Sequence, residues 1–178
     1  MNNLLAEIDL AVSNWEPLRV RKGASETDVS RMLLRWPGLC GEYLEFLRFM
    51  GLGCGSFLAD FYYRVDEIWG VNERHARNLE DDLVDPDLAE VLDVSGMREG
   101  VDGDGNILRY DCKFFVPFTL ISRDHGFMFV DGCELQEFDD TFACAGHPVG
   151  FMSFLRQELR EYERLFQEMP VKPKYGEL

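Results

Sequence analysis

The stretch EYLEFLRFMGLG, residues 42–53, decides most about the fold of this chain. Its apolar side chains cover nearly the whole circumference of a helix and leave Glu42, Glu45 and Arg48 as a narrow polar stripe at a spacing of three. A helix that is apolar nearly all round is a buried one. Glycines then alternate through residues 51–55, and glycine accepts the positive φ at which helices commonly end. The sequence predicts a buried central helix that ends in a glycine turn.

The same glycines invite comparison with a phosphate-binding loop. Such loops follow a strand and begin a helix, whereas residues 51–55 follow a helix and precede an aromatic stretch typical of a strand. No Lys-Ser or Lys-Thr pair follows them either. We therefore expect a turn, and no bound nucleotide.

Three further helices are predicted around this central one. Residues 4–15 carry apolar side chains at helical spacing and stop before Pro17. Ser25 and Asp28 have the spacing of a capping box, which predicts a helix from there to about Arg35. Pro148 lies near the start of a long closing helix. The apolar face of that helix carries Phe151, Leu155, Leu159, Tyr162 and Phe166.

The middle of the chain carries strand patterns separated by the turn-forming sequences DGDGN, SRDHG and DG. These patterns predict an α+β fold in one domain, residues 1–178. Its central, mostly antiparallel sheet has about five or six strands and is flanked by N-terminal helices and a long C-terminal helix. The predicted strands are 57–65, 90–94, 107–110, 114–121, 127–130 and 134–138.

Charge is distributed unevenly. The net charge is −15, and residues 60–104 hold fourteen acids against four bases, whereas residues 1–35 hold five of each. Residues 124–140 add six acids and no base. Nucleic-acid binding exchanges condensed cations for Lys and Arg, so this surface argues against a nucleic-acid partner. A basic protein partner and plain solubility remain the two explanations.

The sequence also predicts a compartment. The first fifteen residues have no basic region ahead of their apolar residues, and no apolar run approaches the ~18 residues that span a bilayer. The five cysteines are odd in number and show no paired CxxC spacing, which is typical of reduced, mostly buried thiols. We expect a cytoplasmic protein with no membrane partner.

No motif predicts catalysis, a metal or a cofactor. The sequence DGDGN at residues 102–106 imitates the start of a calcium loop, but Ile107 and Lys113 occupy the positions that need Gly and Glu. Cys144 with His147 offers only two metal ligands. We expect a hairpin turn and no metal.

An enzyme is the alternative from another functional class. Cys144 or Cys133 could act as a nucleophile activated by His125 or His147, as in a hydrolase. No motif in the sequence distinguishes either of these pairs. Among thirty-three acidic residues, no pair of carboxylates stands out as a candidate for acid–base catalysis either. We expect a protein that is not an enzyme.

The order of features in residues 25–69 resembles the SUKH superfamily, bacterial immunity proteins that include the Smi/Knr regulators. Its members typically read Leu-Pro-x-x-Tyr-x-x-Phe-Leu followed by a glycine turn, and Tyr43, Phe46 and Leu47 occupy that pattern. The sequences FFVPFTLISRDHGFMFVD and PVGFMSFLRQEL are also similar to the family's second half. Residues 1–24 fall outside the resemblance as an N-terminal helical extension.

The resemblance implies an immunity protein that binds and occludes a cognate toxin of an interbacterial competition system. A nuclease is one candidate toxin, because carboxylates can fill a groove shaped for phosphates. The alternative is a Smi/Knr-like regulatory or scaffolding domain without a toxin partner. The resemblance carries over no catalytic residue. The acidic contact residues predicted from the charge pattern are Glu80, Asp81, Asp82, Asp85, Asp87, Glu134, Glu137, Asp139 and Asp140.

Overall fold

The computed structural model describes residues 3–35, 39–68, 70, 97–101, 107–111, 118–120, 126–131, 133–138 and 144–168. Several sequence predictions lie outside these residues. They are the acidic contact residues at 80–87, the strand at 90–94, the turn sequence DGDGN, and the turn sequence SRDHG apart from its Gly126.

Four predicted helices are confirmed, namely α1 (Asn3–Trp15), α2 (Glu26–Arg35), α3 (Gly41–Met50) and α6 (Phe151–Glu168). Both reciprocal hydrogen bonds of the predicted capping box form at the start of α2. The backbone N–H of Asp28 donates to Ser25 Oγ at 3.2 Å, and the backbone N–H of Ser25 donates to Asp28 Oδ2 at 3.2 Å. The local sequence thus sets where α2 begins.

Helix α3 lies at the centre of the fold, as its apolar circumference predicts. Tyr43, Phe46, Leu47 and Met50 are fully buried, and the stripe of Glu42, Glu45 and Arg48 is exposed. The glycine turn follows: Gly51 N–H donates to Leu47 O at 2.8 Å, and the φ angles of Gly53 and Gly55 are 142° and 68°. The glycines are needed for these conformations, which other residues rarely adopt.

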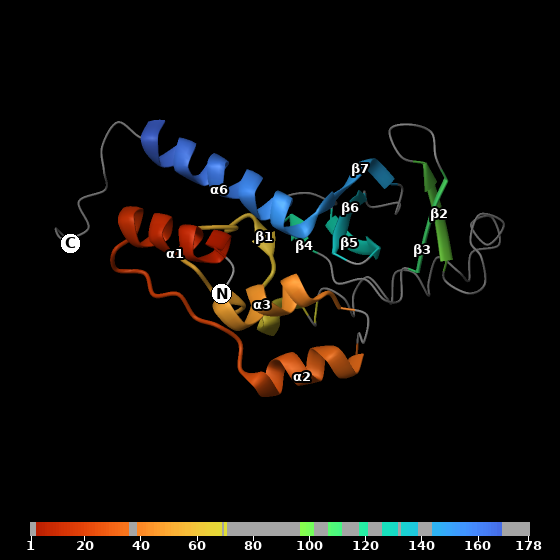
Figure 1. The fold of residues 1–178 in the computed structure, drawn as a ribbon, viewed down its shortest axis with the longest axis horizontal. Helices are drawn as coiled ribbons and strands as arrows, with labels where there is room; N and C mark the ends of the chain where they lie inside the picture. The colour runs from red at the N-terminus through yellow and green to blue at the C-terminus, as the bar shows by residue number, and fades with distance from the viewer. Residues whose placement is uncertain are drawn as a thin grey trace.

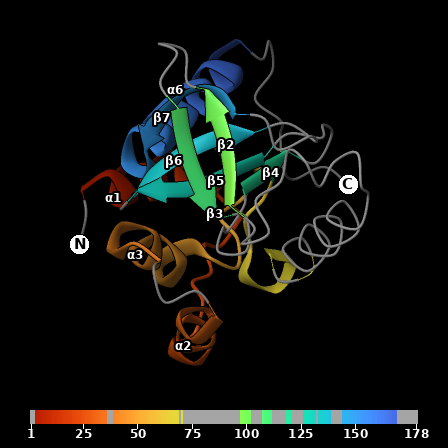
Figure 2. The same ribbon diagram turned by 90° about the vertical axis from the view of Figure 1, so that its right-hand side faces the viewer.

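The strands form two sheets (Figures 1 and 2). In the larger sheet the order is β1-β4-β5-β6-β7, and every neighbouring pair is antiparallel. The smaller sheet pairs β2 with β3. The bounds are β1 (Phe61–Tyr62), β2 (Met97–Val101), β3 (Ile107–Asp111), β4 (Phe118–Leu120), β5 (Gly126–Asp131), β6 (Glu134–Phe138) and β7 (Cys144–Gly150).

This division corrects the predicted architecture. The α+β class is confirmed, but the prediction that the strands form a single central sheet of five or six is wrong, because they are divided between a sheet of five and a separate sheet of two. The strand predicted at 107–110 belongs to the separate two-stranded antiparallel sheet, where Ile107 of β3 lies opposite Val101 of β2. Neither β2 nor β7 was predicted. The sequence CAGHPVG of β7 is built from small and turn-forming residues, and its Pro148 is tolerated because β7 is an edge strand.

The prediction of a strand over residues 57–65 is also wrong in most of its length. Only Phe61 and Tyr62 form a strand, Leu58 has a φ of 59°, and residues 65–68 form a helical turn. Most of the aromatic and branched side chains that predicted the strand are nevertheless buried, namely Phe57, Leu58, Phe61, Tyr63 and Val65. They enter the core from an irregular loop, so burial rather than strand pairing explains their apolar character.

The core lies where α1, α3 and α6 meet the larger sheet. Figure 1 shows α6 running alongside α1 and reaching the sheet at its other end, with α2 below α3 and away from the sheet. The N-terminal extension belongs to this core: Trp15 of α1 stacks on Phe166 of α6 with ring centroids 5.5 Å apart. Among the described helices, none combines the length and the apolar character needed to cross a membrane. The buried residues of α1 are Leu4, Leu5, Ile8, Ala11 and Val12.

Candidate interaction surface

The predicted acidic contact surface lies mostly outside the described residues. Glu134 and Glu137 are the two predicted contact residues that the structure describes. The other seven are Glu80, Asp81, Asp82, Asp85, Asp87, Asp139 and Asp140.

The two described residues, Glu134 and Glu137, lie on opposite faces of strand β6. Glu137 is half-buried and lies opposite Phe127 of β5, whose ring packs on Phe154 of α6. Glu134 is exposed, and the alternation of a strand places it on the other face of the sheet. The structure therefore does not bring Glu134 and Glu137 into one surface.

The structure does bring together carboxylates that the sequence analysis did not single out. Asp60 directly precedes β1, and Glu158 lies in the middle of α6. Burial raises the pKa of the half-buried Glu158, and the negative charges of Glu161 and Asp60 raise it further. Only the spacing of three between Glu158 and Glu161 could be found from sequence. The approach of Asp60 depends on how α6 packs.

The carboxylate group consists of Asp60, Glu158 and Glu161, of which Glu161 is ion-paired with Arg164 of the same helix. A raised pKa means that ionised Glu158 has a higher free energy here than in water. A cation placed against the group would lower that free energy by screening the mutual repulsion. The group can therefore favour a positively charged partner.

Replacing Glu158 by glutamine is expected to stabilise the protein at neutral pH by less than about 1 kcal/mol, since the repelling charge is removed while the shape is kept. The raised pKa gives the sign of this effect. The free-energy penalty for ionising Glu158 is absent below the unfolded pKa near 4.5 and reaches its full size as the pH rises through the folded pKa. Urea denaturation between pH 4 and pH 8 would measure it. A variant that gains nothing at pH 8 relative to pH 4 would contradict the repulsion.

A second carboxylate, Glu16, is only 5% exposed and has its partners within the chain. Its Oε1 accepts hydrogen bonds from Ser56 N–H at 2.8 Å, from the Ser56 hydroxyl at 2.6 Å and from the Tyr162 hydroxyl at 2.8 Å. Burial acts to raise the pKa of Glu16, but these hydrogen bonds and the charge of Arg19 outweigh it and leave the pKa lowered. Glu16 thus joins α1, the loop around Ser56 and α6, and is structural.

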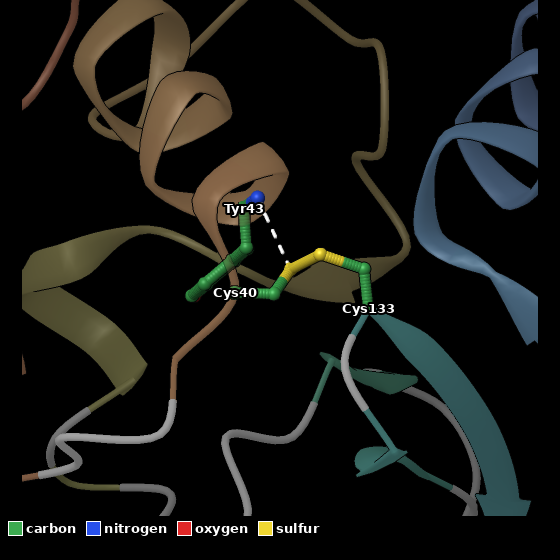
Figure 3. Close-up of a disulfide and its surroundings, with 3 residues drawn as sticks. All are labelled: Cys40, Tyr43 and Cys133. Atoms are coloured by element: carbon green, nitrogen blue, oxygen red, sulfur yellow. Dashed lines mark hydrogen bonds between the residues drawn. A yellow bond between two sulfur atoms is a disulfide. The ribbon is translucent and has the colours of Figure 1, made fainter.

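The cysteines depart from the expectation of reduced thiols. Cys40 and Cys133 form a disulfide, with their Cα atoms 5.2 Å apart (Figure 3). Cys133 is therefore not a free nucleophile in this form of the protein. Cys54 is a free thiol, and burial raises its pKa to about 12, so it is unreactive at neutral pH.

The other catalytic and metal candidates are Cys144, His125 and His147, and Cys144 is the first residue of β7. His147 is exposed on β7, and His125 lies outside the described residues. Over those same residues, no cluster of three His, Cys, Asp or Glu side chains has an arrangement that could hold a metal ion. The expectation that this protein is not an enzyme stays a prediction.

Comparisons of the chain with known proteins give no match. No protein-family pattern, no curated protein and no solved structure matches it.

Proposed function

We propose that this chain is an immunity protein that binds a cognate toxin of an interbacterial competition system in the cytoplasm and neutralises it by occlusion. The proposal follows the SUKH resemblance of residues 25–166. The observation that supports it most directly is the acidic excess, a net charge of −15 that includes the carboxylate group of Asp60, Glu158 and Glu161. A basic partner, such as a nuclease with a cationic groove, has the complementary chemistry.

The carboxylate group gives this proposal a physical mechanism. Surface charges that are mostly of one sign steer an oppositely charged partner and raise the association rate. On docking, cationic side chains would take the place of water around Glu158 and favour its ionised form. Binding by this mechanism is fast and weakens as salt is added.

The direct test is co-purification of the chain with the product of the neighbouring gene, followed by the affinity of the complex at several salt concentrations. We expect a stable complex whose affinity falls with salt. The double variant Asp60→Asn, Glu158→Gln should lower the affinity about tenfold, mainly through slower association.

The matched control is Glu42→Gln, which removes one exposed carboxylate from α3. It should change the affinity less than twofold if the carboxylate group carries the contact. A mixture in which the chain and the neighbouring toxin stay separate would contradict the immunity function. A complex insensitive to Asp60 and Glu158 would leave the function standing and place the contact elsewhere.

A further inference from the structure

The Cys40–Cys133 disulfide lies at a junction of three elements (Figure 3). Cys40 is the N-cap residue of α3, and its Sγ accepts the backbone N–H of Tyr43 at 3.4 Å. Cys133 lies in the turn between β5 and β6, and its carbonyl accepts the backbone N–H of Phe151, the first residue of α6, at 2.7 Å. One covalent bond therefore joins residues 93 positions apart and ties α3 to the β5–β6 turn beside α6.

The two sulfur atoms are in different surroundings. Cys40 is 8% exposed, whereas Cys133 is partly exposed. A thiolate at Cys40 is stabilised by the N-terminus of α3 and by the Tyr43 N–H that already points at its sulfur. Attack by an outside thiol is easier at the accessible sulfur, and the better-stabilised thiolate is the better leaving group. Both preferences select the same direction of cleavage.

We propose that Cys40–Cys133 is a site of reversible thiol–disulfide exchange, in which an external dithiol attacks Cys133 Sγ and Cys40 leaves as a thiolate. The first step breaks the Cys40–Cys133 bond and forms a mixed disulfide between the external sulfur and Cys133. The second thiol of the reductant then displaces Cys133 and closes its own disulfide. Two electrons and two protons pass to the pair Cys40 and Cys133, and the dithiol is oxidised to a disulfide.

The surrounding core explains why the bond can open without unfolding the protein. The Tyr43 ring lies 5.1 Å from that of Phe129 and 5.5 Å from that of Phe151, and Phe129 lies 5.8 Å from Phe151. These rings come from α3, β5 and α6, the elements that meet at the disulfide. After reduction the aromatic contacts keep the two thiols close, so an external disulfide can oxidise the pair again by the same exchange in reverse.

A reversible bond also suits the compartment proposed for this chain. Disulfides in a reducing compartment are usually transient or redox-sensing, whereas permanent structural ones belong to oxidising compartments. The exchange site itself does not depend on the toxin-binding function. Its chemistry would remain if the partner were different.

The test treats the full chain with dithiothreitol under native conditions and then with oxidised glutathione. After each step the thiols are alkylated and assigned by peptide mass spectrometry, and far-ultraviolet circular dichroism follows the fold. We expect complete reduction of Cys40 and Cys133 with the helical signal retained, and re-formation of the same bond on oxidation. A bond that resists reduction until the protein is denatured would overturn the proposal. Loss of the fold on reduction would also overturn it.

A second measurement tests the direction of cleavage. In the reduced protein the alkylation rate of each cysteine is followed against pH and scaled to its own maximum, which removes the effect of exposure. We expect the rate of Cys40 to reach half its maximum at a lower pH than the rate of Cys133. Equal or reversed midpoints would overturn the assigned leaving group. Buried Cys54 is the internal control and should stay unmodified throughout.

Discussion

Replacing Phe151 by alanine is expected to lower the free energy of unfolding by about 3–5 kcal/mol, the largest effect of any substitution considered for this chain. Phe151 is fully buried at the start of α6. Its ring lies 5.5 Å from Tyr43, 5.5 Å from Phe46 and 5.8 Å from Phe129. Truncation would leave a cavity between α3, β5 and α6, since these neighbours are fixed in two packed elements, α3 and β5, and cannot all relax into it.

Urea denaturation would measure the loss, and the melting temperature should fall by about 10 °C for a chain of this size. The matched control is Leu165→Ala in the same helix, where the side chain is 48% exposed. That substitution should cost less than about 1 kcal/mol. A Phe151 variant no less stable than the Leu165 variant would show that the aromatic cluster does not hold α6 on the sheet.

The same residues show which parts of the fold can be predicted from the sequence. Phe151 repeats with Leu155 and Leu159 at helical spacing, and the apolar circumference of residues 42–50 indicates a buried helix. Helices are predicted well here because their periodicity, caps and stops are all local in sequence. Ser25 and Asp28 are three residues apart, and their hydrogen bonds form as that spacing predicts.

The division of the strands into two sheets depends on partners that are far apart in sequence. Whether β3 joins the larger sheet or pairs with β2 alone is decided by tertiary packing, and no local pattern records it. Edge strand β7 is built from CAGHPVG, whose glycines and proline are usually signs of a turn. A register shift in its pairing with β6, between Leu135 and Glu137, accommodates this unusual composition.

The candidate site was predictable only as a charge imbalance. The sequence shows an excess of acids in residues 60–104, but not that Asp60 approaches Glu158 of α6. The disulfide was missed for a related reason. Cys40 and Cys133 are 93 positions apart, and pairing cannot be deduced from the number or spacing of the cysteines. The net charge of a segment can be counted from the sequence, whereas the pairing of two distant residues depends on the fold.

Replacing Glu16 by alanine is expected to cost about 2–3 kcal/mol at neutral pH. The substitution removes the acceptor of three hydrogen bonds, two from Ser56 and one from Tyr162. The buried Tyr162 hydroxyl left without an acceptor would cost about 1–3 kcal/mol, whereas water can reach the donors of the exposed Ser56. The carboxylate is also tightly enclosed, because a Cβ atom placed on Gly55 would lie only 2.8 Å from Glu16 Oε1.

The lowered pKa of Glu16 gives this loss a pH dependence. A carboxyl whose folded pKa lies below its unfolded value of 4.5 stabilises the protein above that value, and the stabilisation disappears as pH falls through the folded pKa. The difference between the parent chain and Glu16→Ala should therefore be largest above about pH 5 and shrink in acid. Urea denaturation at pH 7 and pH 3.5 would measure it.

Two milder variants separate the charge from the hydrogen bonds. Glu16→Gln keeps an oxygen acceptor and loses the charge, so it should cost about 1 kcal/mol at neutral pH. The stability of this variant should lack the loss in acid that protonation of Glu16 causes in the parent chain. Tyr162→Phe removes one of the three donors and should cost about 1 kcal/mol while keeping the pH dependence. If Glu16→Ala were no more damaging than Glu16→Gln, the donors of Ser56 and Tyr162 would have found water. Glu16 would then contribute to stability mainly through its charge beside Arg19.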